Sequence, residues 1–277
     1  MKRVAAMVAA LVLAGVAAGG NGLTAQSAAF LAGRQSQSGG FAEQGRTPDA
    51  ALTAWAVLGL VATGGSTAER ALAAGYLRSG IAGASTDGDL ALRVIALDAL
   101  GETVDDSLLA RLRHHPPGVL VNETIWCVLA LSAAGEQPPP TLVQAIVAAQ
   151  AKGGGFPWSR GGSPDSNDTA AAIQALRAAG VNGAPVKRAI VALRGFQATS
   201  GGFSLTKGRE PDAQSTAWAI QALLSAGEAP AKGPFRFLAR LRRSDGSYRY
   251  SARYATTPVW VTAQVLPALA GRPFPFR

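Results

Sequence analysis

The strongest constraint on the fold is an internal repeat that runs through most of the chain. Three segments are near copies of one another: SGGFAEQGRTPDAALTAWAVLGLVATG (38–64), GGGFPWSRGGSPDSNDTAAAIQALRAAG (153–180) and SGGFSLTKGREPDAQSTAWAIQALLSAG (200–227). Each has Gly-Gly-Phe, a polar loop, Pro-Asp, and an apolar run that ends in glycine. A weaker copy covers 245–271, and copies of the second half alone cover 87–101 and 121–135.

The repeat predicts a closed ring of helix pairs. Six anchor positions near the starts of the apolar runs are 34 to 47 residues apart, as expected for a repeat array: Thr53, Leu90, Thr124, Thr169, Thr216 and Thr262. In each unit an amphipathic segment precedes one that is apolar on nearly every face, which indicates an outer helix followed by a buried inner helix. An open array usually needs polar capping repeats, and the sequence shows none. We therefore expect an all-α fold, an (α/α)6 toroid, whose inner helices stop at glycines in C-cap positions, namely Gly64, Gly101, Gly135, Gly180, Gly227 and Gly271.

The junctions between units carry a second motif, Gln-x-x-x-Gly-Gly-Phe, which begins at Gln35, Gln150 and Gln197. Paired glycines permit a tight turn with positive φ, the phenylalanine is suited to fill the seam between helices, and the glutamine can bond loop backbone. The motif resembles the Gln-Trp repeat of squalene–hopene cyclases, with Phe in place of Trp. The resemblance covers about 26–271 and extends to terpenoid cyclases, protein prenyltransferase β-subunits and cobalamin carriers. It implies an α/α toroid but no particular activity, because this fold carries both enzymes and binding proteins.

The N-terminus has the pattern of a secretory signal peptide. Lys2 and Arg3 precede an apolar run over 4–18, which is too short for a comfortable membrane span and is followed by small residues. We expect cleavage after Ala18 or Ala25, a signal segment over 1–25, one toroid domain over 26–277, and a secreted or cell-envelope location. Cys127 is the single cysteine, so an exported chain would depend on its core and not on internal disulfides.

One copy of the repeat, GGSPDSNDTAAAIQAL, places carboxylates close together at Asp165 and Asp168. In squalene–hopene cyclases, an Asp-x-Asp-Asp-Thr-Ala motif supplies the acid through its middle Asp, and the resemblance places Asn167 at that position. An amide cannot protonate an alkene, so we expect this chemistry to be absent unless Asp168 acts as a substitute acid.

The other copies of this segment favour a structural role for the first carboxylate. Asp49 and Asp212 align with Asp165, and an Asp repeated before a helix is typical of an N-cap. Asp168 has no counterpart carboxylate in those copies, and Glu123 stands in the same register of another unit.

Aromatic residues converge on the face where the inner helices begin. Convergent aromatic side chains with a few polar groups are typical of a small-molecule site, although tryptophans on buried helices also serve simply as core. The candidate ligand-binding residues are Trp55, Glu123, Trp126, Trp158, Asn167, Asp168, Trp218, Tyr250, Tyr254 and Trp260.

Other functions receive less support from the sequence. The formal net charge of +9 favours anionic partners, but the basic residues are scattered, so nucleic acid is not expected. Prenyltransferase-like zinc needs Asp, Cys and His ligands, and the only histidines are the pair His114 and His115, so we expect no metal and no cofactor. A glycan-processing (α/α)6 enzyme needs two carboxylates across a groove, for which Asp168 with Glu123 or Asp212 are the candidates.

These observations predict a secreted toroid that binds a hydrophobic or amphipathic small molecule, isoprenoid- or corrinoid-like, without catalysis. Cobalamin carriers close a β-rich domain over their ligand. The sequence up to residue 277 shows no such domain, so a lid is expected from a separate protein or a membrane partner. The alternative is a terpene or squalene cyclase-type enzyme that uses Asp168, or less directly Asp165, and the third possibility is the glycan-processing enzyme.

Overall fold

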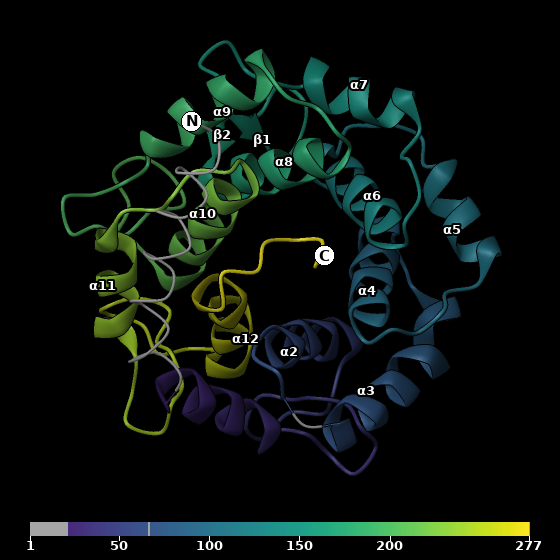
Figure 1. Cartoon of the computed structure of the whole chain (residues 1–277), viewed down its shortest axis with the longest axis vertical. Coiled ribbons are helices and arrows are strands. Elements are labelled where there is room, and N and C mark those ends of the chain that lie inside the picture. Colours follow the sequence, from purple (N-terminus) through teal and green to yellow (C-terminus); the bar gives the residue numbers. More distant parts are fainter. Residues whose placement is uncertain (1–21, 66, 277) are drawn as a thin grey trace, which may run out of the picture.

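The computed structural model describes residues 22–65 and 67–276, and they form a ring of two concentric layers of helices (Figure 1). Of the predicted signal segment over 1–25, residues 1–21 lie outside the described residues. The inner layer contains α2 (Ala50–Ala62), α4 (Asp87–Ala99), α6 (Val121–Ala133), α8 (Ser166–Ala178), α10 (Ala213–Ser225) and α12 (Pro258–Leu269). The outer layer contains a helical segment over 22–32, α3 (Thr67–Gly80), α5 (Asp106–Arg113), α7 (Pro140–Ala148), α9 (Ala184–Arg194) and α11 (Lys232–Leu241).

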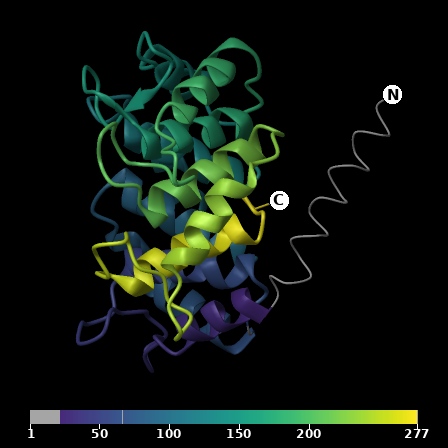
Figure 2. The ribbon, with the colours of Figure 1, turned by 90° about the vertical axis from the view of Figure 1, so that its left-hand side faces the viewer.

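The ring is closed, as the repeat predicts. Each inner helix packs against the next one along the chain, and α12 packs against α2 to complete the circle. Short elements join the pairs: a 3-10 turn η1 (Ile81–Gly83), and the antiparallel strands β1 (Phe156–Pro157) and β2 (Pro164–Asp165). Seen from the side, the loop before α12 and the C-terminal end of the chain lie on opposite faces of the ring (Figure 2).

The Gly-Gly-Phe loops have the structural roles predicted for them. Phe41, Phe156 and Phe203 are fully buried between helices. The side-chain amide of the glutamine in each motif donates to the first glycine's carbonyl oxygen, at 2.8 to 3.1 Å. That glycine has φ between 88° and 91° at all three junctions, a conformation that side-chain-bearing residues rarely adopt.

The anchor threonines connect each of these loops to the inner helix that follows. Thr53 Oγ accepts a hydrogen bond from the Phe41 amide at 2.9 Å and donates to the Asp49 carbonyl at 2.6 Å. Thr169, Thr216 and Thr262 accept the corresponding loop amide at the same distance. The sequence shows these threonines as a recurring position, but it does not show that their hydroxyls satisfy buried loop backbone.

The prediction that the repeated Pro-Asp is a helix N-cap is confirmed. The carboxylates of Asp49, Asp165 and Asp212 each accept the backbone amide three residues later, at 2.7 to 2.8 Å. The six predicted stop glycines all follow an inner helix with φ between 67° and 80°. An aspartate cap at the start and a glycine at the end therefore define the length of α2, α8 and α10.

We expect Asp49→Ala to lower the free energy of unfolding by about 0.5–2 kcal/mol, because the Leu52 amide loses its cap. Urea unfolding followed by circular dichroism measures this change. Asp49→Asn is the matched control, since its amide oxygen can still accept the bond, and it should lose about half as much or less. Equal losses in the two variants would show that the charge, and not the cap, provides the stability.

Candidate functional site

Three of the predicted site residues meet on the ring axis. Trp55, Trp126 and Trp218 come from alternate inner helices, α2, α6 and α10, at the sixth position of each. Their ring centroids are 5.6 to 5.9 Å apart and every pair is edge-to-face, a favourable geometry for aromatic rings. We call these three residues the tryptophan triad. The predicted convergence is therefore present, and the rings pack against one another as a plug across the axis.

The triad is covered on the side where the inner helices end. Phe274, from the segment after α12, is almost fully buried and contacts Trp55 and Trp218 at centroid distances of 6.1 and 5.7 Å. Trp218 and Trp55 are only 4% and 8% exposed, whereas Trp126 is half-buried. Of the triad, Trp126 therefore offers the largest exposed fraction of its surface to a ligand.

A group of half-buried polar and aromatic side chains lies one helical turn above the triad, at the inner-helix N-terminal ends. Residues four positions apart share a helix face, so Asn122 and Gln214 stand over Trp126 and Trp218. Asn167 occupies the same position on α8, and Trp260 on α12, and all four side chains are half-buried. The mouth is defined here as these four residues together with Trp126, which gives three amides beside indole surface.

Asp168 lies beside this mouth but is covered. It is only 4% exposed, and the Asn122 side-chain amide donates to its Oδ1 at 2.6 Å across the α6–α8 interface. Burial raises the pKa of Asp168 to about 8, the hydrogen bond and charge of Asp165 act in the same direction, and the bond from Asn122 opposes them. Asp168 is therefore mostly a neutral carboxylic acid at neutral pH.

Asp165 and Asn167 have simpler surroundings. Asp165 Oδ1 accepts the Asp168 backbone amide at 2.8 Å, so this carboxylate caps α8. The Asn167 side-chain oxygen accepts a bond from the Ser166 hydroxyl at 3.3 Å. The start of α8 thus contains a capping carboxylate (Asp165), a half-buried amide at the mouth (Asn167) and a buried acid (Asp168).

The remaining predicted site residues are more scattered. Glu123 is half-buried near the start of α6, where its side chain approaches Gly88 on α4. Trp158 and Tyr254 are 54% and 58% exposed, and they lie in the loops before α8 and α12. These loop aromatics therefore do not join the triad, and any contact with a ligand would occur at the rim.

Asp212, the third carboxylate of the glycan-processing hypothesis, is the N-cap of α10. It is buried and accepts bonds from the amide and hydroxyl of Ser215, at 2.7 and 2.8 Å. Burial raises the pKa of Asp212 to about 6, while the Ser215 bonds and the half-buried Tyr250 hydroxyl lower it. These contacts favour a structural role over that of a free glycosidic acid or base.

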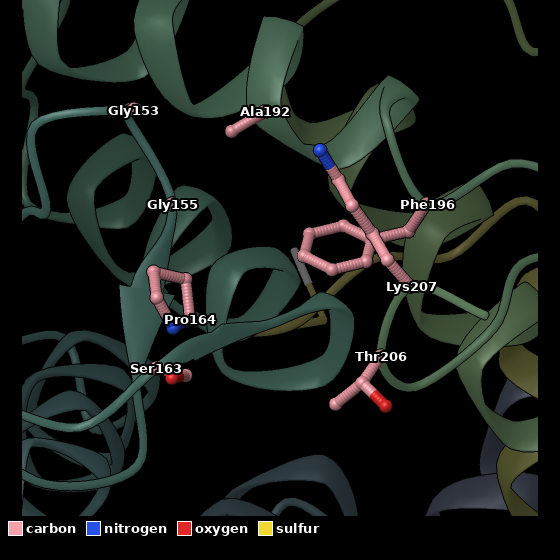
Figure 3. Close-up of a pocket in the computed structure, with 8 residues that line it drawn as sticks. All are labelled: Gly153, Gly155, Ser163, Pro164, Ala192, Phe196, Thr206 and Lys207. Carbon is pink, nitrogen blue, oxygen red and sulfur yellow. The ribbon is translucent and has the colours of Figure 1, made fainter. Parts of the chain in front are cut away.

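A separate cavity of about 370 Å³ lies outside the ring axis, between α9 and the loops before α8 and α10 (Figure 3). Figure 3 shows the Phe196 ring on one side, Pro164 on the other, and the Lys207 side chain between Phe196 and the viewer. Gly153, Gly155, Ser163, Ala192 and Thr206 complete its lining. The lining contains none of the site residues predicted from the sequence.

The histidine pair and the cysteine have structural surroundings. His115 Nδ1 is 2.7 Å from Asp87 Oδ2, and its Nε2 is 3.3 Å from the Thr124 hydroxyl, in a unit that lacks a Gly-Gly-Phe loop. Cys127 is buried, and burial raises the pKa of its thiol. Within 22–65 and 67–276, no three His, Cys, Asp or Glu side chains are grouped as metal ligands would be. None of the helices described there is long and apolar enough to cross a membrane.

Comparison with solved structures supports the fold. The type II terpene cyclase MstE from Scytonema, in complex with geranylgeranyl dihydroxybenzoate, superposes with a TM-score of 0.66 at 14% identity, covering 90% of this chain and 96% of that one. A glycosidase in complex with glucose gives 0.66 at 12% identity, covering 91% and 97%. The ent-copalyl diphosphate synthase from Streptomyces platensis gives 0.56 at 19% identity, covering 80% and 50%. No protein-family model and no curated protein matches the sequence.

These neighbours establish that the chain has the α/α-toroid fold found in terpene cyclases, as the Gln-x-x-x-Gly-Gly-Phe motifs suggested. The same fold occurs in the glycosidase, so the likeness does not select one chemistry. The residues that bear on function are therefore those of the mouth, the triad and Asp168.

Proposed function

We propose that the toroid binds an amphipathic small molecule across the mouth, at the N-terminal ends of the inner helices, without transforming it. The observation that carries this proposal is the tryptophan triad, because it fills the axis directly beneath the mouth. A ligand here rests on the mouth and does not enter the ring. Its apolar face would pack on Trp126 and Trp260, and its polar groups would bond the amides of Asn122, Asn167 and Gln214.

The chemistry of the mouth supports this class of ligand. Side-chain amides both donate and accept, and flat indole surface beside them suits a molecule with one apolar face and polar edges. MstE, with a similar fold, is bound to an isoprenoid carrying a dihydroxybenzoate, which is an amphipathic compound of this kind. An isoprenoid alcohol and a corrinoid are therefore the first ligands to test. A lid from a separate chain or a membrane partner belongs to the same proposal.

Asn167→Ala is the variant that best tests binding, because within the described part of the chain the Asn167 side chain has only the 3.3 Å bond from Ser166 to lose. We expect saturable quenching of tryptophan fluorescence by geranylgeraniol or by cobinamide, with Asn167→Ala weakening the affinity by about fivefold, the effect of one lost hydrogen bond. Trp158→Ala is the control and should leave the affinity unchanged. Binding that is unaffected by Asn167→Ala would place the ligand elsewhere.

Acid catalysis by Asp168 is the second candidate, and two observations favour it. Asp168 is a carboxyl beside the mouth whose pKa is raised by burial, so it carries a proton at neutral pH, and the neighbouring structures are of enzymes. The same rise in pKa makes it a weaker proton donor to an alkene. The covered carboxyl and the filled axis weigh against this candidate. Incubation with squalene and geranylgeranyl substrates, followed by gas chromatography, separates the two functions. We expect no cyclic product from the native protein or from Asn167→Asp, and product that disappears in Asp168→Asn would establish the enzyme.

Export is part of the same proposal. The Lys2-Arg3 pair and the apolar run after it would direct the chain out of the cytoplasm, and N-terminal sequencing of the exported protein should find a start between residues 19 and 26. An exported chain that still begins at Met1 would contradict cleavage. The first described helix already begins at residue 22, and the Leu23 carbonyl accepts bonds from Ser27 and Arg242. Cleavage after Ala18 would keep these contacts.

A further inference from the structure

The C-terminal segment 272–276 occupies the ring axis on the side opposite the mouth (Figures 1 and 2). Phe274 is 3% exposed and lies against Trp55 and Trp218. Phe276 stacks on Phe274 at a centroid distance of 5.0 Å, and the Arg272 guanidinium lies 4.7 Å from the Phe276 ring centroid. This segment belongs to none of the six repeats, yet it fills space that is walled by the inner helices.

The walls around Phe274 carry amide groups that the segment uses only in part. The Phe274 backbone N–H donates to Gln174 Oε1 at 2.8 Å in a buried position. Among the residues that the structure describes, three buried amide atoms have no hydrogen-bond partner: Gln174 Nε2, Gln221 Oε1 and Gln264 Nε2. An unpaired buried polar atom costs free energy, so the segment is a poor match for the polar part of this site.

The three glutamines come from consecutive inner helices, α8, α10 and α12. Gln264 Oε1 accepts the Trp218 indole N–H at 2.8 Å and the Gln214 side-chain amide at 3.1 Å, so Gln264 lies beside the triad toward the mouth. Gln174 is the one that bonds Phe274 directly, through its Oε1. Its unpaired Nε2 is therefore the free polar atom next to the Phe274 amide.

The segment is held mainly by its aromatic rings and makes few backbone hydrogen bonds to the ring of helices. Pro273 and Pro275 have no backbone N–H to donate. The Arg272 guanidinium reaches the Val61 carbonyl at 3.3 Å, a long bond, and the Arg272 amide bonds the Pro267 carbonyl at 2.9 Å. The ring is closed by α12 against α2 independently of these contacts. Withdrawal of residues 272–276 would therefore leave the ring closed.

We propose that the C-terminal end of the ring axis is a second binding site, for a small aromatic compound that carries an N–H donor and further polar groups, and that residues 272–276 occupy it as a displaceable internal ligand. The aryl ring of the compound replaces Phe274 against Trp55 and Trp218. Its N–H donates to Gln174 Oε1, and one of its other polar groups accepts from the unpaired Gln174 Nε2. The tryptophan triad separates this site from the mouth.

The test uses the full chain with para-fluorophenylalanine at position 274, observed by fluorine NMR. N-acetyl-L-phenylalaninamide is the probe, since it offers an aryl ring with neighbouring N–H and carbonyl groups. We expect a second signal, at the shift of a solvent-exposed ring, to grow saturably as the probe is added. The same label at Phe203, a buried residue of a Gly-Gly-Phe loop, is the control and should give one unchanged signal.

An analogue of the probe distinguishes a specific site from a loose segment. The analogue with an ester oxygen in place of the acetamide N–H cannot donate to Gln174, whereas the Phe274 N–H of the segment still can. It should therefore bind about fivefold more weakly than the amide. N-acetyl-L-leucinamide, which lacks the aryl ring, should displace the segment less than the phenylalanine compound. A position-274 signal that stays unchanged up to the solubility limit of the probe would overturn the proposal. So would equal displacement by the phenylalanine and leucine compounds, or an ester analogue that displaces the segment as well as the amide does.

Discussion

Trp218→Ala is expected to lower the free energy of unfolding by about 3–5 kcal/mol. Trp218 contacts both other members of the tryptophan triad, at 5.9 and 5.7 Å, and also Phe274. Its indole N–H donates to Gln264, whose Oε1 would lose this bond. The substitution therefore combines a cavity on the ring axis with the loss of a buried hydrogen bond, and urea unfolding followed by circular dichroism measures the sum.

The chain provides a matched control for this change. Trp158→Ala removes the same side chain from an exposed loop position and should alter the free energy of unfolding by no more than about 0.5 kcal/mol. If Trp218→Ala proved as mild as Trp158→Ala, the axis would not be filled as described. The mouth proposal would then lose its basis, because a ligand could enter the ring.

Features that repeat along the chain could be predicted from the sequence. The Pro-Asp caps, the stop glycines and the Gln-x-x-x-Gly-Gly-Phe junctions depend on local backbone geometry, and each is present as expected. Repetition also located the triad, because a tryptophan at one position of alternate inner helices must point toward the axis of a closed ring. Local propensity and the repeat period thus agreed on the fold.

Features that occur once could not be predicted in this way. The Arg-Pro-Phe-Pro-Phe segment lies outside the repeat and has no helical period, so nothing in the sequence indicated that Phe274 would cover the triad. The contact between Asn122 and Asp168 joins two dissimilar units, and alignment of the repeats could not show it. Trp158 lies in a loop whose course depends on its neighbours, and its side chain is exposed and makes no contact with the triad among the ring pairs of the described residues.

The stability of the protein is expected to fall as the pH rises from about 4 to about 8, and Asp168 is the main cause. The ordinary pKa of an aspartate is 3.8. Burial, and to a smaller extent the hydrogen bond and charge of Asp165, raise the pKa of Asp168 to about 8. Between these limits the folded chain keeps a proton that the unfolded chain has released. The contribution of this group is therefore complete below pH 4 and is lost on the way to pH 8, with a slope of up to about 1.4 kcal/mol per pH unit.

Asp168→Asn tests this expectation because the amide is nearly isosteric with the neutral acid but cannot ionise. Asp212, with a pKa near 6, adds a slope of the same sign that ends at about pH 6. The effects of Asp168 and Asp212 on stability can therefore be distinguished between pH 6 and pH 8. In this range the free energy of unfolding of Asp168→Asn should rise relative to that of the native chain by about 1–3 kcal/mol. The curve of Asp212→Asn against pH should stay parallel to the native curve. Urea unfolding at a series of pH values gives both curves. Parallel curves for Asp168→Asn would mean that Asp168 is ionised in the folded chain, which would remove the neutral acid on which the catalytic alternative depends.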